Sequence, residues 1–553
     1  MFAGVNFSIV LLPFGFFLLA ASSLTAQRAV EVTMGPEIVH KAKFPPPEMT
    51  IGADGTGIYV QRATSGDDII LERYGHDLNL ELSRTLRPEW NGFPLEPWYM
   101  FQLGDGFHLV ARYKDQKNDT AFFLSTRIDP MTLLPMEDWT TFGKVDTKGR
   151  KPTISFFQGS RGTRVAFGLK ERGTETQFGS IGFDSGRIFY TDYAMDEAEQ
   201  DVHEFIMVDT EMTVQWNHRF ALQETEGEFD RWETIVGPED IVYMNGRKTN
   251  DRGKTVVDGK PNYVHRVYGL DGSGIVMEAT IDLGEKFIKS ASLKLIAGEL
   301  CVTGFFAEDP SMEARGVYLQ KIDFRSGAVT ERVEHRFPQS TFVQLYGLEK
   351  GERAFDKFTQ VPKNGIEYLK LSAVIPMPDG GLRMIGEIKW KDAINRTTPR
   401  PSPSASLKYQ KTTSSNIFYT RQILIIDLDS NGDLTRTSVV QKHQDVAYEQ
   451  QFSSFSHFRS AENGQSFFLF NDHPENLVPF NIADGKVRKW NGQKGCVSLV
   501  ELDDSGAQVR SSIFDIREEE FAVYSSITMR ITDNERVILC GYKGNERWIR
   551  LRW

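Results

Sequence analysis

Length, composition and charge set the first limits on this chain. It has 553 residues, of which 40% are hydrophobic, 12% aromatic and 25% charged, and such a composition is typical of a globular protein with a substantial core. Its net charge of -11 argues against a general nucleic-acid binder, because binding to phosphate backbones needs a basic surface.

Residues 1–26 have the pattern of a secretory signal peptide. An apolar run from Ile9 to Ala21 is followed by small residues, which favours cleavage after Ala26. No Lys or Arg precedes the run, so an uncleaved anchor is the alternative. We therefore expect an exported protein, periplasmic, cell-surface or extracellular, whose mature chain covers residues 27–553 without a further membrane span.

Eight segments of the mature chain each read as a β-hairpin, with an apolar stretch on either side of a short Gly, Asp or Asn turn. They begin at Met49, Met100, Ile154, Glu233, Leu293, Ser372, Ser456 and Ile527. A second set of hairpins alternates with them, and Asp marks most of its turns, at residues 75–77, 129–130, 209–211, 271–274, 323–327, 427–432 and 503–506. Two hairpins per repeat predict a four-stranded antiparallel unit.

Repeated four-stranded units of this kind resemble the blades of the β-propeller superfamily, and the turn at residues 378–381 is similar to turns of secreted bacterial propellers. The resemblance covers residues 29–553 and implies a single all-β domain of about eight blades. Seven blades are the alternative because the third unit is irregular, and two tandem sandwiches are the other all-β arrangement. The strand Ala29–Met34 is expected to pair with the last blade and close the ring, which removes two open sheet edges.

The long connections of such a propeller are predicted to lie on one face, between strands 2 and 3 or between blades. They cover residues 174–204, 246–264, 337–367, 389–416 and 471–495. Long loops on a rigid scaffold commonly carry binding sites. Two of these loops are basic, with five cations against two carboxylates over residues 247–260 and six against one over residues 389–411. They supply the candidate ligand-binding residues for an anionic ligand, which are Arg247, Lys248, Arg252, Lys254, Lys391, Arg396 and Arg400.

One segment has the spacing of a calcium-binding loop, with oxygen-bearing side chains at Asp427, Asp429, Asn431 and Asp433. The twelfth position is Ser438, so the bidentate carboxylate of such a loop is missing and a hairpin turn is the alternative. Ca²⁺ is thus a possible ligand, and no other cofactor is predicted. The three cysteines, Cys301, Cys496 and Cys540, are interpreted as core residues, with one disulfide or a reactive thiol as the alternative.

No hydrolase, zinc, phosphate-loop or dinucleotide motif accompanies the repeats. The sequence therefore favours a secreted or periplasmic binding or scaffold protein that engages a protein or a glycan through its long-loop face. The alternative is a carbohydrate-active hydrolase or lyase whose carboxylates converge at the mouth of the channel. The catalytic residues, the ligand and the oligomeric state stay open.

Overall fold

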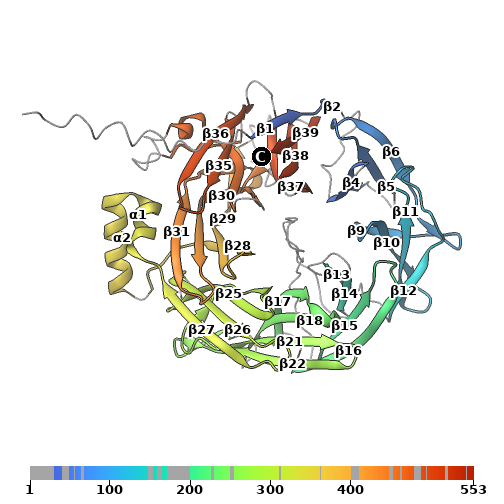
Figure 1. The fold of residues 1–553 in the computed structure, drawn as a ribbon, viewed down its shortest axis with the longest axis horizontal. Coiled ribbons are helices and arrows are strands. Elements are labelled where there is room, and N and C mark those ends of the chain that lie inside the picture. The colour runs from blue at the N-terminus through green and yellow to red at the C-terminus, as the bar shows by residue number, and fades with distance from the viewer. Residues whose placement is uncertain are drawn as a thin grey trace, which may run out of the picture.

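Antiparallel sheets are arranged in a ring in the computed structural model (Figure 1). The structure describes residues 30–39, 49–54, 56–63, 68–146, 153–158, 165–170, 200–225, 229–249, 254–310, 313–361, 363–399, 410–447, 452–460, 464–478, 487–492, 495–516, 521–532, 534–542 and 545–553. In these ranges eight sheets have four or five strands, and each sheet is one blade. The predicted β-propeller fold is confirmed.

Each of the first four blades is a four-stranded meander. From the inner strand outward they consist of β3 (Met49–Asp54), β4 (Gly57–Ala63), β5 (Ile69–Tyr74) and β6 (Leu80–Leu86); β9 (Glu96–Leu103), β10 (Gly106–Asp115), β11 (Thr120–Ile128) and β12 (Thr140–Asp146); β13 (Thr153–Gln158), β14 (Val165–Lys170), β15 (Gln200–Val208) and β16 (Val214–Thr225); and β17 (Phe229–Val236), β18 (Val242–Thr249), β21 (Tyr263–Asp271) and β22 (Gly274–Ile281).

The last four blades follow the same order, and three of them carry an extra strand. They consist of β24 (Ser292–Ile296), β25 (Glu299–Ala307), β26 (Gly316–Ile322) and β27 (Val329–Arg336), with β23 (Phe287–Ile288); β28 (Leu369–Pro376), β29 (Leu382–Pro399), β30 (Gln410–Leu428) and β31 (Leu434–Val440), with β32 (Gln444–Ala447); β33 (Ser456–Arg459), β34 (Ser466–Asp472), β35 (Cys496–Leu502) and β36 (Gln508–Asp515); and β37 (Ala522–Thr532), β38 (Glu535–Tyr542), β39 (Asn545–Arg552) and β1 (Glu31–Met34), with β2 (Ile38–Val39).

A few short elements lie in the connections between these strands. They are β7 (Glu89–Trp90), β8 (Phe93–Pro94), β19 (Val256–Val257), β20 (Lys260–Pro261), the 3₁₀ turns η1 (Pro238–Asp240) and η3 (Pro474–Leu477), and the helices α1 (Gln339–Tyr346) and α2 (Leu348–Gln360).

The predicted turns form because their side chains satisfy the backbone locally. The carboxylate of Asp323 accepts a hydrogen bond from the backbone N–H of Ser326 at 2.7 Å, and Asp503 accepts one from Ser505 at 2.9 Å. Asp favours such turns because its carboxylate takes up backbone donors two or three residues later. In the β28–β29 turn Gly380 has a φ of 85°, which glycine adopts without steric cost.

The core lies between neighbouring blades. Most residues of β25 and all residues of β35 are buried, because both faces of each blade are covered by the next blade. These two middle strands therefore do not alternate strictly between buried and exposed residues. Cys301, Cys496 and Cys540 are free and buried, which confirms their interpretation as core residues.

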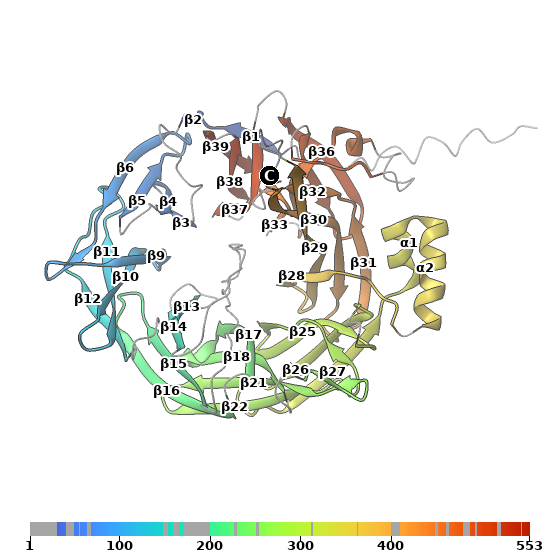
Figure 2. The same ribbon diagram turned by 180° about the vertical axis from the view of Figure 1, so that it is seen from behind.

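The N-terminal strand closes the ring, as predicted. β1 pairs antiparallel with β39, from Glu31 opposite Arg552 to Met34 opposite Ile549. The last blade thus takes three strands from the end of the chain and its fourth strand from the beginning, as the views from both sides show (Figures 1 and 2).

A buried ion pair joins the first blade to this last blade. Arg62 on β4 has no exposed side-chain surface, and its guanidinium lies 2.7 Å from both Glu72 on β5 and Glu546 on β39. Burial alone would lower the pKa of Arg62, but the two carboxylates outweigh it and raise that pKa above its usual value. The closure is therefore held by side-chain charges as well as by strand pairing.

For two of the predicted long loops the prediction is wrong, because the segments form regular secondary structure. Residues 337–367 contain α1 and α2, which pack on the outer rim of the ring beside blade 6 (Figures 1 and 2). Each helix is short and Gly347, with a φ of 82°, separates them, so no extended helical period marks the segment. Within the described ranges, no helix is both long and apolar enough to cross a membrane.

Residues 389–416 form a β-ribbon where the sequence predicted a loop. β29 and β30 stay paired from the blade out to Pro399 opposite Gln410, and residues 400–409 lie outside the described ranges. The β-branched residues of this segment favour strands. Of the other predicted loops, 174–204 is described only from Gln200 onward, where it belongs to β15, and 246–264 begins within β18. In 471–495, residues 487–492 run beside β32.

Candidate functional site

Arg247 and Lys248, predicted on a basic loop, lie within strand β18 of blade 4. The guanidinium of Arg247 is 5.9 Å from the centre of the Trp232 ring and 5.5 Å from that of Tyr263. Cations stack in this way on the electron-rich faces of aromatic rings. Arg247 therefore packs against aromatic rings of its own blade.

The remaining predicted basic residues are spread over two blades. Lys254 lies between β18 and β19, while Arg252 is outside the described residues. Lys391 is exposed on β29 of blade 6, Arg396 follows on the same strand, and Arg400 is outside the described residues. Blade 5 stands between the two groups (Figure 1), so they do not share one location.

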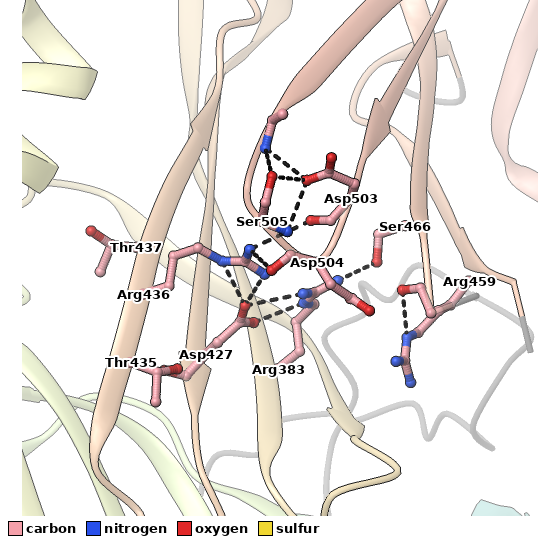
Figure 3. Close-up of polar contacts among 12 residues, drawn as sticks. Arg383, Asp427, Thr435, Arg436, Thr437, Arg459, Ser466, Asp503, Asp504 and Ser505 are labelled. Atoms are coloured by element: carbon pink, nitrogen blue, oxygen red, sulfur yellow. Dashed lines mark hydrogen bonds and ion pairs between the residues drawn. The ribbon is translucent and has the colours of Figure 1, made fainter. Parts of the chain in front are cut away.

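Asp427, the first residue of the candidate calcium loop, is engaged by two arginines (Figure 3). Its carboxylate accepts hydrogen bonds from Nε and Nη2 of Arg383 at 2.7 and 3.0 Å, and from Nε of Arg436 at 2.9 Å. Arg383 also donates to the hydroxyl of Ser466 at 2.7 Å. Two positive charges thus stand at the place where a cation would have to bind, and the group ties blade 6 to blade 7.

The other members of that loop form a hairpin turn between β30 and β31. The Asp429 carboxylate accepts hydrogen bonds from the backbone N–H groups of Asn431 at 2.8 Å and Asp433 at 2.9 Å. Gly432 takes a φ of 78° at the sharp bend. This is the same use of Asp as in the other outer hairpins.

A row of three stacked aromatic rings crosses blade 6 on its long-loop side. Tyr368 precedes β28, Trp390 is on β29, and Tyr419 is its direct cross-strand partner on β30. The ring centres of Tyr368 and Trp390 are 5.1 Å apart, and those of Trp390 and Tyr419 are 4.9 Å apart at an interplanar angle of 6°. We call these three residues the aromatic row.

Tyr368 forms the open end of the aromatic row. It lies beside the inner strand of the blade and is therefore the residue of the row nearest to the centre of the propeller. It is 44% exposed, and its backbone has a φ of 55°, a conformation that aromatic residues rarely adopt. Its carbonyl accepts a hydrogen bond from the N–H of Lys389 at 3.1 Å, which fixes it to the ribbon. Backbone strain of this kind concentrates at functional sites.

Four charged or titratable residues stand at the other end of the row, and we call them the charged end: Arg421, His443, Asp445 and Lys489. The Asp445 carboxylate lies 2.6 Å from Arg421, 3.3 Å from Lys489 and 3.6 Å from His443. Burial would raise the pKa of Asp445, but the nearby His443 ring and the hydrogen bond from Arg421 outweigh it and lower that pKa to about 2. Asp445 is therefore ionised at neutral pH.

Buried ion pairs support the base of the ribbon from beneath. Glu387 and Lys442 have no exposed side-chain surface and their charged atoms are 2.8 Å apart, while the hydroxyl of Ser454 donates to Glu387 at 2.7 Å. The side chain of Asp472 on blade 7 pairs with Arg510 at 2.9 Å. Each of these carboxylates thus pairs with a cation of its own blade.

The aromatic row was missed by sequence reasoning. Its rings lie in three separate strands or strand ends, and only the pairing register of β29 with β30 brings Trp390 and Tyr419 together. The segment was predicted to be a long connecting loop, so its alternating pattern was not used as a signal. If the alternation had been followed through Trp390 and the two halves of the segment had been paired with each other, the pattern would have indicated that Trp390 and Tyr419 share a face of the sheet.

Comparison with family models and with curated protein sequences finds no match. Among solved structures, the chain is similar to the WD40 domain of SCAP from fission yeast, at 8% identity over 95% of this chain and 94% of that one, with a TM-score of 0.39. It is also similar to the polysaccharide lyase Uly1, at 8% identity over 92% and 90% of the two chains, with a TM-score of 0.37. A third is the β-propeller domain of the Trilobed protease from Pyrococcus furiosus, at 9% identity, 77% and 90% coverage and a TM-score of 0.30.

These similarities concern the fold alone, and the three neighbours are a WD40 domain, a lyase and the propeller domain of a protease. The ring of blades and its closure by β1 define the chain as a β-propeller protein. Its function has to be argued from its own site.

Proposed function

We propose that this chain is an exported, non-catalytic binding propeller that holds a glycan against the aromatic row of blade 6. The observation that carries the proposal is the stack of Tyr368 on Trp390, with one ring 44% exposed at the open end. An aromatic face is a suitable surface for a sugar ring, because it offers rigid apolar area beside polar groups that orient the ligand.

The surroundings of the row favour binding over hydrolysis. A glycosidase needs two carboxylates about 5 to 10 Å apart that hold and release protons or attack the sugar. Near the row, Glu387, Asp445 and Asp472 are each paired with a cation at 2.6 to 2.9 Å. A fourth carboxylate, that of the exposed Asp392, accepts a hydrogen bond from the indole N–H of Trp390 at 3.3 Å. Carboxylates tied in this way suit a rigid scaffold. Export rests on the signal-like segment at residues 1–26.

Removing the exposed ring tests the proposal. Tyr368→Ala is expected to weaken glycan binding about tenfold, or about 1.4 kcal/mol, because the stacking surface for the sugar is lost. The measurement is isothermal titration calorimetry or affinity electrophoresis of the mature chain with a panel of polysaccharides.

Phe93→Ala is the matched control for this variant. Phe93 is 51% exposed on β8 and packs at a tilt against Tyr113, with ring centres 5.3 Å apart, so it is another open ring backed by an aromatic residue. Binding that survives in Tyr368→Ala, or that Phe93→Ala reduces equally, would show that the row is not the site. Release of sugar products from the panel would favour the enzyme alternative.

A further inference from the structure

The charged end of the row differs from the aromatic end in what it offers a ligand. The guanidinium of Arg421 lies 4.9 Å from the centre of the Trp390 ring and 5.4 Å from that of Tyr419. The cation of Arg421 thus packs against the middle ring and the far ring of the aromatic row. This end therefore combines an aromatic surface with a fixed positive charge.

All hydrogen bonds of Arg421 to described residues use a single nitrogen. Nη1 donates to the backbone carbonyls of Thr420 at 3.3 Å and Gln444 at 2.9 Å, and to the Asp445 carboxylate at 2.6 Å. Among the described residues, Nε and Nη2 have no hydrogen-bond partner, and the side chain keeps 18% of its surface exposed. Guanidinium groups recognise carboxylates through two adjacent N–H groups.

The balance of charge at this end is positive. Arg421 and Lys489 are basic side chains, and the Asp445 carboxylate between them is the one acidic group of the charged end. Lys489 is 52% exposed whereas Asp445 is 16% exposed, so the cation faces solvent and the carboxylate lies below it. An approaching ligand thus meets positive charge first, in a protein whose overall charge is -11.

We propose that the site selects an acidic glycan, with a sugar ring on Tyr368 and a sugar carboxylate at Arg421 and Lys489; this inference rests on the proposed glycan-binding function. Two ring-to-ring steps, of 5.1 and 4.9 Å, separate Tyr368 from Tyr419. A ligand that reaches both ends is therefore longer than a single sugar ring.

Binding to polygalacturonate, alginate and hyaluronan, each compared with its carboxyl-reduced form, tests the selection. The reduced polymers keep the backbone and lose the negative charge. The wild-type chain is expected to bind at least one native polymer about tenfold more tightly than its reduced form at low salt. The preference is expected to shrink between 50 and 500 mM NaCl, because salt screens exposed charges.

Two substitutions at the charged end give opposite expectations. Lys489→Gln is expected to weaken binding of the native polymer about threefold without changing binding of the reduced one. Asp445→Asn removes the one negative charge and is expected to strengthen binding of the native polymer about threefold. A purely structural role for Asp445 does not predict a gain. Lys260→Gln is the control, since Lys260 is an exposed lysine on blade 4 that pairs with Glu285 at 2.6 Å.

The outcomes separate the two proposals. If native and reduced polymers bind equally and Tyr368→Ala weakens both, the glycan-binding function stands and the acidic selection is overturned. If no polymer binds, or Tyr368→Ala changes nothing, both are overturned. If Lys260→Gln matches Lys489→Gln, the preference reflects general charge and the assignment to blade 6 is overturned.

Discussion

At the scale of single residues, a charged side chain and a buried histidine lie opposite each other on neighbouring strands of blade 4. Arg247, a predicted ligand residue, stands beside His265, which is buried between the rings of Trp232 and Tyr263 at 4.3 and 5.5 Å. Among the described residues, neither ring nitrogen of His265 has a hydrogen-bond partner. Burial and, to a lesser extent, the charge of Arg247 lower the pKa of His265 to about 3.

This histidine predicts a pH dependence of stability. Between its ordinary pKa of 6.5 and the folded value of about 3, the unfolded chain binds more protons than the folded chain. The free energy of unfolding is therefore expected to fall as the pH drops below 6.5, by about 1.4 kcal/mol per pH unit from this residue. Chemical denaturation at pH 7.0, 6.0 and 5.0 measures it, and His265→Phe should lose that part of the slope. Equal slopes in the two proteins would contradict the prediction.

At the scale of elements, the sequence did not predict the secondary structure of two segments. These are the helix pair α1 and α2 and the ribbon formed by β29 and β30. The helices α1 and α2 meet at Gly351, where an added Cβ would lie 2.5 Å from the Cα of Val343 and 2.6 Å from the carbonyl oxygen of Phe342. The helix pair is fixed to blade 5 by Arg315, which donates to the carbonyl of Phe358 at 2.6 Å and stacks on its ring. Close backbone packing therefore holds the helix pair.

Gly351→Ala is expected to destabilise this helix pair, although Ala in a helix interior usually stabilises by about 1 kcal/mol relative to Gly. The new methyl group would collide with backbone, and such overpacking costs about 1 to 3 kcal/mol. Limited proteolysis within residues 339–360 and thermal unfolding measure the effect. Lys350→Ala, at an exposed neighbouring position, serves as the control, and cleavage that is equally fast in both variants would refute the packing argument.

At the scale of the whole molecule, stability depends on the joint between the first and last blades. β1 supplies the outer strand of the last blade, and Arg62 bridges Glu72 and Glu546 from within. The hydrophobic cluster around this joint includes Tyr74 and Trp548, whose rings pack edge to face at 5.6 Å. An unpaired carboxylate in such a place has no water to solvate it.

Arg62→Met is therefore expected to cost about 3 to 5 kcal/mol, because it leaves two buried carboxylates without their cation. Thermal and chemical unfolding measure the loss. The control is Arg353→Met, whose pair with Glu349 at 3.6 Å is 70% and 91% exposed and contributes less than about 1 kcal/mol. A loss in Arg62→Met no larger than in this control would mean that the closure does not depend on the ion pair.

Much of the architecture follows from short-range patterns. The eight inner hairpins starting at Met49 to Ile527 all fold as strands 1 and 2 of a blade, and the Asp-marked turns join strands 3 and 4. Turn chemistry and strand propensity act over a few residues, so they can be recognised in a single sequence. The closing strand was predictable for a related reason, since the last unit has three strands and an open edge needs a partner.

The sequence by itself therefore determined the class of fold, its repeat and its closure. Only the tertiary structure decided that residues 389–416 form a ribbon, that Arg247 stacks on rings, and that Asp427 is held by two arginines. It also decided that Tyr368, Trp390 and Tyr419 form one row. The physical reason is that such contacts depend on the register between strands and on packing between blades, which join residues distant along the chain.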